Sequence, residues 1–124
     1  MAVKNVADSL VSFCREGKFL EAVDALYSDG IVSIEPVGSE EMPAEIQGKA
    51  KVRGKSEWWL ANHEVHRIEV TGPYVGEDQF AIHLFTDVTF KPANQRMTMT
   101  EMCLYTVEGD QIVKEQFFYN APNP

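Results

Sequence analysis

One glutamate interrupts an otherwise apolar stripe in the segment 96–107. Alternate residues of an extended chain point to the same side, so Glu101 shares one face with Met99, Cys103 and Tyr105. A carboxyl group on a buried face must be protonated or paired, because burial disfavours its charged form. We therefore interpret Glu101 as a candidate acid in a ligand pocket that Cys103 and Tyr105 line. The alternative is a rim residue that pairs with an arginine.

A second glutamate, Glu35, stands directly before a proline at the end of a short β-branched segment. Ile31, Ser33 and Glu35 share one face of this predicted strand, and Pro36 ends it. We expect Glu35 and Glu101 to meet across one cavity. A carboxylate there can remove a proton next to a carbonyl group, provided that a second polar group stabilises the product. For Glu35 too, an ion pair at the pocket rim is the alternative.

A third acid lies near the end of the chain among aromatic residues. The segment 111–119 puts Glu115, Phe117 and Tyr119 on one face, and these three are further candidate binding residues. Trp58 and Trp59 are adjacent on a predicted helix and are expected to be core residues. Because adjacent side chains on a helix point in different directions, the alternative is that either one lines the pocket.

Composition and charge limit the classes of function. A chain of 124 residues predicts one domain, residues 1–124, and its 44% hydrophobic and 24% charged residues are typical of a folded globular protein. The 19 acidic and 11 basic residues give a net charge of −8, which repels a phosphate backbone. Nucleic acid is therefore not an expected partner.

Membrane and metal signals are also missing from the sequence. No apolar run approaches the roughly 18 residues of a membrane-spanning helix, and the first residues lack the apolar stretch of a signal peptide. We expect a cytoplasmic protein without a membrane partner. Cys14 and Cys103 lie in apolar patterns, where free cysteine packs as a small hydrophobe. The three histidines match no metal-ligand spacing, so no metal or other cofactor is expected.

The first half of the chain has helical periodicity. Apolar residues recur at steps of three and four from residue 3 to residue 14, where Gly17 ends the pattern, and again from 19 to 27. We predict a turn at 28–30, a loop at 37–47 and a third helical region at 49–63. Gly54 interrupts that region, which predicts two short helical pieces.

From residue 66 onward the hydrophobic period changes to two. Four strands are predicted at 66–71, 79–91, 96–107 and 111–119, with hairpin connections at 72–73, 92–94 and 108–110. Helices followed by an antiparallel sheet indicate an α+β fold with the helices on one sheet face. A sheet of such long strands must twist and bend, which leaves a cone-shaped cavity under the helices.

The outward face of this sheet is expected to carry Ala81, His83, Phe85 and Thr89. This mixture is too apolar for a free surface and suits a contact between identical patches. A homodimer through the sheet face is therefore predicted.

The run 27–40, which reads YSDGIVSIEPVGSE, resembles the corresponding stretch of the bacterial ketosteroid isomerases. The closing patterns LYTV at 104–107 and IVKEQFFY at 112–119 are more similar to the SnoaL-like polyketide cyclases. Both groups belong to the nuclear-transport-factor-2-like superfamily, whose order of elements resembles that of the whole chain. The resemblance implies a cystatin-like α+β barrel, with three helical regions packed on a curved, mainly antiparallel sheet around a cone-shaped pocket.

The resemblance also implies roles for individual residues. Glu35 matches the isomerase general base, Tyr27 matches a supporting tyrosine, and Trp59 falls where the isomerases place another. The protonated acid of the isomerase oxyanion hole corresponds to Glu101 or Cys103, depending on where a gap is placed in the 108–110 turn. The oxyanion-hole tyrosine has no counterpart, because a leucine, residue 10, stands at its position.

These matches imply a pocket for a small apolar or carbonyl-bearing molecule, with isomerase or cyclase chemistry at an enolisable carbonyl. The missing tyrosine argues against efficient steroid isomerisation, since one such donor is worth roughly 10²-fold in rate. A noncatalytic ligand-binding or dimerisation module of the same fold is the alternative.

Overall fold

The computed structural model describes residues 2–120. Its first helix, α1 (Ala2–Arg15), buries the apolar stripe that the spacing predicted, including Leu10 and Cys14. Gly17 ends the helix, as expected: its φ is +72°, and the Lys18 N–H donates to the Phe13 carbonyl at 2.9 Å. This arrangement is a Schellman cap, which satisfies carbonyl groups that the helix end would otherwise leave unpaired.

The turn predicted at 28–30 is wrong. Helix α2 (Phe19–Leu26) is followed at once by strand β1 (Tyr27–Ile34). Tyr27 already pairs with Ile112 of the last strand, and a register shift between Tyr27 and Val32 accommodates the residues expected to form the turn. The early start of β1 places the Tyr27 side chain in the core, where it is 6% exposed.

Two predictions for the middle of the chain are also wrong. Within the expected 37–47 loop, β2 (Glu45–Gln47) forms a short strand that pairs antiparallel with β1. The third helical region is one continuous helix, α3 (Lys49–Asn62), instead of two pieces. Gly54 lies on its exposed side, so packing of the buried side holds the helix together across it.

The second half of the chain forms four antiparallel strands: β3 (His63–Val75), β4 (Gln79–Phe90), β5 (Gln95–Glu108) and β6 (Gln111–Phe118). The 92–94 connection is confirmed, with the short helix η1 (Lys91–Ala93) and a left-handed Asn94, as is the connection at 108–110. Gly72 and Pro73 instead lie inside β3, at a bulge, and the chain reverses at 76–78. Because β3 is an edge strand, a proline without an N–H is tolerated there.

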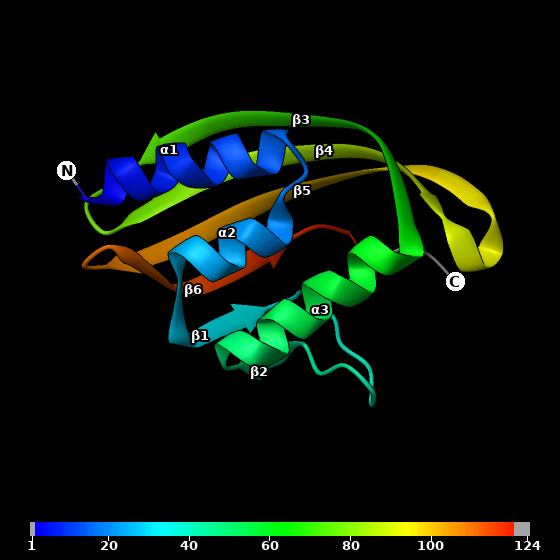
Figure 1. Cartoon of the computed structure of the whole chain (residues 1–124), viewed down its shortest axis with the longest axis horizontal. Helices are drawn as coiled ribbons and strands as arrows, with labels where there is room; N and C mark the ends of the chain where they lie inside the picture. The colour runs from blue at the N-terminus through cyan, green and yellow to red at the C-terminus, as the bar shows by residue number, and fades with distance from the viewer. Residues whose placement is uncertain (1, 121–124) are drawn as a thin grey trace.

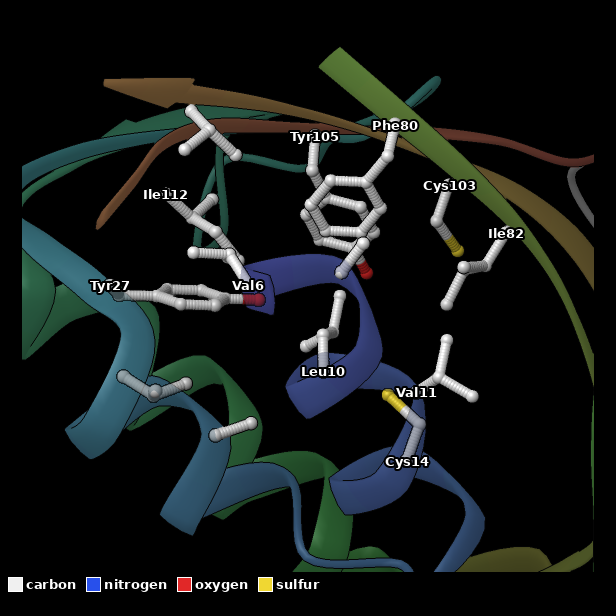
Figure 2. Packing of buried hydrophobic residues seen from close by; sticks show 14 of the residues in the cluster. Val6, Leu10, Val11, Cys14, Tyr27, Phe80, Ile82, Cys103, Tyr105 and Ile112 are labelled. Carbon is white, nitrogen blue, oxygen red and sulfur yellow. The ribbon is translucent and has the colours of Figure 1, made fainter. Parts of the chain in front are cut away.

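The six strands form one curved sheet in the order β2-β1-β6-β5-β4-β3, antiparallel except for the parallel pair β1 and β6. The three helices lie along one face of it (Figure 1). Leu10 points from α1 toward the stacked rings of Phe80 and Tyr105 in the core (Figure 2). The predicted α+β class is therefore confirmed. Among residues 2–120, no helix is long and apolar enough to cross a membrane.

A difference in strand length shapes one end of the sheet. β6 ends at Phe118, which pairs with Met102, so the first half of β5 continues past the end of β6. Glu101 lies on β5 at this boundary. Residues 95–101 of β5 therefore have no pairing partner in β6, and Glu101 lies at the edge of this unpaired part.

Candidate functional site

Glu115 is the most deeply buried acid of the site. It lies on the inner face of β6 at 3% exposure, beside Ser33 of the neighbouring strand β1. Ser33 Oγ donates to Glu115 Oε2 at 2.7 Å, and the Tyr27 hydroxyl donates to Oε1. Burial raises the pKa of Glu115, while the Lys55 ammonium and the two hydrogen bonds oppose that shift.

The ammonium group of Lys55 reaches this cluster from α3. Its Nζ donates to Ser33 Oγ at 2.6 Å and to Glu35 Oε1 at 3.3 Å, and it lies 3.9 Å from Glu115 Oε2. Nζ also lies 5.1 Å from the centroid of the Phe117 ring. The Lys55 side chain is only 14% exposed, so water screens these interactions less than it would at the surface.

Glu35 follows β1 and is anchored by its backbone, because its N–H donates to the Ala44 carbonyl at 2.8 Å. The two oxygens of its carboxylate differ: Oε1 accepts from Lys55, whereas Oε2 is buried and accepts no hydrogen bond from residues 2–120. A buried acceptor without a partner is unfavourable, so Oε2 favours the approach of a proton or a ligand donor.

Glu101 lies on the inner face of β5, where the alternation of residues predicted it. The Cys103 thiol donates to Glu101 Oε1 at 3.7 Å. Burial and, next, the negative charge of Glu35 raise the pKa of Glu101 to about 7. At neutral pH, Glu101 is thus divided between a neutral form, which can donate a hydrogen bond, and an ionised form.

An open hollow of about 440 Å³ leads to Glu101 at the end of β6. Its lining residues are Pro36, His83, Thr100, Glu101, Met102, Phe118, Tyr119 and Asn120. Because Pro36 directly follows Glu35, the hollow extends from one acid to the neighbour of the other. Burial, then the charge of Glu35 and the approach of the phenol to that carboxylate, raise the pKa of Tyr119, which therefore stays neutral as a hydrogen-bond donor.

The structure brings most of the predicted site residues together. The cluster around Lys55 and the adjacent hollow contain Tyr27, Glu35, Glu101, Cys103, Glu115, Phe117 and Tyr119.

Trp59 and Tyr105 contact other groups. Trp59 stacks on His63 with ring centroids 4.3 Å apart, and its ring also meets the edge of Phe19. Tyr105 is buried and stacks on Phe80 with centroids 4.9 Å apart. These two residues support the helix end and the core, respectively.

Leu10 occupies the core position that the resemblance assigns to a catalytic tyrosine. It is 1% exposed and lies below the rings of Phe80 and Tyr105 (Figure 2). A leucine side chain donates no hydrogen bond. The lining side chains of the hollow that can donate one are those of His83, Thr100, neutral Glu101, Tyr119 and Asn120.

The part of the chain that the structure describes shows no set of side chains that could ligate a metal ion. Residues 2–120 contain no group of three or more histidine, cysteine, aspartate or glutamate side chains placed to hold a metal ion.

Sequence reasoning missed Lys55. The signal was present: Val52, Lys55 and Trp59 follow at steps of three and four, so the lysine lies on the same side of α3 as the fully buried Val52. A lysine on a buried helix face needs an anionic partner, and the acids predicted for the pocket are such partners.

Comparison with known families and structures gives three results. The model of the SnoaL-like domain matches residues 1–119 of this chain. A solved structure from Mesorhizobium loti, described provisionally as a SnoaL-like polyketide cyclase, is 39% identical, and the match covers 96% of this chain and 100% of that one with a TM-score of 0.88. No curated protein matches the sequence.

More distant structures share the fold alone. An NTF2-like protein from Anabaena variabilis is 12% identical over 98% of this chain and 91% of that chain, with a TM-score of 0.76. A Xanthomonas campestris protein with a cystatin-like fold is 16% identical over 98% and 92% of the two chains, with a TM-score of 0.77. The family match over residues 1–119 and the 39% identical structure show that this chain belongs to the family of SnoaL-like domains.

Proposed function

We propose that this chain binds a small, uncharged, carbonyl-bearing molecule and catalyses proton transfer at its enolisable carbon, as an isomerase or a cyclase does. The observation that carries the proposal is the pair of acids with different surroundings. Glu35 is held by an ammonium group and has one free oxygen, while burial keeps Glu101 partly protonated near pH 7. Membership of the SnoaL-like family supports this chemistry without naming a substrate.

In the proposed reaction, the Glu35 side chain turns toward the hollow that its neighbour Pro36 lines, and its carboxylate takes a proton from the carbon next to the carbonyl group. The electron pair of the broken C–H bond moves to the carbonyl oxygen, where neutral Glu101 donates a hydrogen bond to the developing enolate. Glu35 then returns its proton to a carbon of the enolate. Alternatively, the enolate carbon attacks a second carbonyl group and closes a ring, the electron pair of that C=O π bond moves to its oxygen, and the resulting alkoxide takes the proton from Glu35. Two carboxyl groups can take these opposite roles because their surroundings favour different protonation states.

The charges around the hollow favour an uncharged substrate. Glu35 and Glu115 lie within 4 Å of one ammonium group, that of Lys55, the partly ionised Glu101 adds negative charge nearby, and the whole chain has a net charge of −8. A carboxylate or phosphate on the ligand would be repelled by this field. A ketone, diketone or hydroxyketone fits it better.

The noncatalytic alternative also has one observation in its favour. The ion pair between Lys55 and Glu35 is an arrangement that a purely structural role would produce. In that case the chain binds a carbonyl compound without exchanging its protons.

Deuterium exchange distinguishes the two functions. We would incubate the wild-type protein in D₂O with a panel of uncharged cyclic ketones and β-diketones, follow the loss of α-proton signals by NMR, and measure binding by native mass spectrometry. The proposal predicts exchange above the buffer rate, reduced at least about 100-fold in Glu35→Gln, whose ligand binding is retained.

The matched control is Glu69→Gln, which removes an exposed glutamate paired with Arg67 on β3. It should exchange at the wild-type rate. Binding without exchange by the wild-type protein would favour the noncatalytic module, and a fully active Glu35→Gln would show that Glu35 is not the base.

A further inference from the structure

Lys55 is held at a defined point between Glu35, which follows β1, and Glu115 of β6. Ser33 is fully buried, and its hydroxyl donates to Glu115 Oε2, so a lone pair of Ser33 Oγ remains to accept from Lys55 Nζ at 2.6 Å. This fixes the ammonium group beside the inner face of β1. From there a second N–H reaches Glu35 Oε1 at 3.3 Å.

Glu35 and Glu101 accept hydrogen bonds from donors of different strength. Glu35 accepts a charge-assisted hydrogen bond from Lys55, which stabilises its ionised form. Glu101 accepts only from the Cys103 thiol at 3.7 Å among residues 2–120, and a thiol is a weak donor. A negative charge shared by these two carboxyl groups is therefore more stable on Glu35.

We infer that Lys55 is the positioning residue of the acid pair: it keeps Glu35 ionised as the base and thereby leaves the remaining proton on Glu101. The inference deepens the proposed function and rests on it for its catalytic meaning. Lys55 acts on the reaction through Glu35, by charge and by holding one carboxylate oxygen.

A nucleophilic role for Lys55 is disfavoured by the same contacts. An amine attacks a carbonyl group only in its neutral form, whereas two carboxylates within 4 Å stabilise the ammonium cation. Ser33 is no nucleophile either, because its hydroxyl is fully buried and committed to Glu115.

Titratable groups from several elements act on this pair and belong in the test. They are Cys14 of α1, Tyr27 of β1, Lys55 of α3, Glu101 and Cys103 of β5, Glu115 of β6, and Glu35 and Tyr119 in the segments that follow β1 and β6. The pKa values of the two tyrosines and the two cysteines are raised, mainly by burial, so these groups stay neutral between pH 4 and 8. Besides His83, which lines the hollow together with Glu101, the groups that can carry charge in that range are the three glutamates and Lys55.

The test is a carbon-detected NMR titration of the glutamate carboxyl groups in the ligand-free protein. Glu35→Gln and Glu101→Gln spectra assign the two signals. In the wild-type protein, Glu101 should take up its proton near pH 7 while Glu35 is still ionised. In Lys55→Met the two curves should overlap, because Glu35 loses the cation that stabilises its ionised form.

Three further variants make the result specific. Lys55→Arg keeps the charge and should preserve the separation of the two curves. Lys51→Met removes an exposed lysine one turn earlier on α3 and should leave both curves unchanged. Lys55→Gln keeps a hydrogen-bond donor without the charge, and it replaces Lys55→Met if that variant does not fold.

Two outcomes would overturn the inference. One is a wild-type protein in which Glu35 takes up its proton at the same pH as Glu101 or higher. The other is a charge-neutral Lys55 variant with wild-type curves. Because the titration uses no substrate, separated curves together with no deuterium exchange would instead reject the proposed function and leave the role of Lys55 intact.

Discussion

Glu115 has almost no contact with water, so its stability depends on the groups around it. The hydroxyls of Tyr27 and Ser33 each donate to one of its oxygens, and the Lys55 ammonium lies 3.9 Å away. Removing one partner from a buried charged group leaves its desolvation cost uncompensated. We therefore expect that removing any one of these partner groups lowers the free energy of unfolding.

We expect Tyr27→Phe to lower the free energy of unfolding by about 1 to 3 kcal/mol, because the phenyl ring fills the same space and donates no hydrogen bond to Glu115. The matched control is Tyr74→Phe, which removes a hydroxyl from a side chain that is 59% exposed. Denaturant melts at pH 7 should show an effect below about 0.5 kcal/mol for the control. Equal stabilities of the two variants would contradict the hydrogen-bonded cluster.

Glu101 gives a pH-dependent prediction. Its pKa in the folded protein is about 7, above its ordinary value of 4.5, so the folded state binds the proton more tightly than the unfolded state. Its unfavourable contribution to stability begins as pH rises past 4.5 and levels off above 7. Glu101→Gln removes the ionisation and keeps an oxygen that can accept from Cys103.

The Glu101→Gln variant should therefore be more stable than the wild type at pH 8, by about 1 to 3 kcal/mol, and nearly unchanged at pH 4. Denaturant melts at the two pH values measure the difference. A variant that is less stable than the wild type at pH 8 would mean that ionised Glu101 is held by favourable contacts.

At the residue scale, strand alternation was enough to place Glu101, Cys103, Glu115 and Phe117 on the inner face. It could not show that Lys55 joins them, because the contact of Lys55 with Ser33 spans 22 residues and depends on how α3 lies across β1. Local patterns contain no such long-range information. Only the burial of one side of α3 hinted at it.

At the scale of elements, Gly17 and Gly54 differ in whether the backbone needs a glycine. Gly17 stands at the end of α1 with φ +72°, and a Cβ there would meet Ile68 Cδ1 at 3.6 Å, an ordinary contact. Gly54 stands inside α3, where no atom lies within 4 Å of an added Cβ. Backbone conformation is thus the main difference between the two sites.

We expect Gly17→Ala to destabilise the protein by about 1 kcal/mol, because a left-handed conformation is strained for alanine. Gly54→Ala should stabilise it by about 0.5 to 1 kcal/mol, because alanine favours a continuous helix. Thermal or denaturant unfolding of both variants decides the point. A Gly54→Ala protein that loses stability would contradict the unbroken helix α3.

The elements that sequence patterns predicted best are those with strong periodicity, namely α1, β4 and β5. The errors lie where tertiary contacts override local preferences. Gly30 is a turn residue by type but lies inside β1, because β1 pairs with β6 at Tyr27 on one side of it and from Val32 onward on the other. Pro73 likewise sits within β3, since an edge strand tolerates the missing N–H.

At the scale of the whole molecule, the outer sheet face carries exposed apolar side chains. Met102 is 41% exposed and Phe118 48% exposed, and the two residues are paired across β5 and β6. Phe85 lies on the same face, where the Arg67 guanidinium covers its ring at 5.8 Å. We propose that this face joins two copies of the chain in a homodimer, so that the second copy borders the hollow that Met102 and Phe118 line.

Light scattering at micromolar concentration should report a dimer for the wild type and a monomer for Phe118→Asp and Phe85→Asp, because a carboxylate would be buried unpaired at the interface. Val37→Asp is the control: it changes a residue that is 51% exposed in the segment between β1 and β2, and it should stay dimeric. A monomeric wild type would contradict the proposal, and dimeric Phe118→Asp and Phe85→Asp variants would place the interface elsewhere.

The central claim is that one acid of the pair works ionised and the other works neutral. The pH dependence of kcat/KM for deuterium exchange, measured on the best ketone of the panel, tests it most directly. The wild-type rate should fall as pH rises past about 7, where Glu101 loses its proton. Glu101→Gln should exchange more slowly and lack this fall. A wild-type rate that stays constant from pH 6 to 9, or the same fall in Glu101→Gln, would contradict the account.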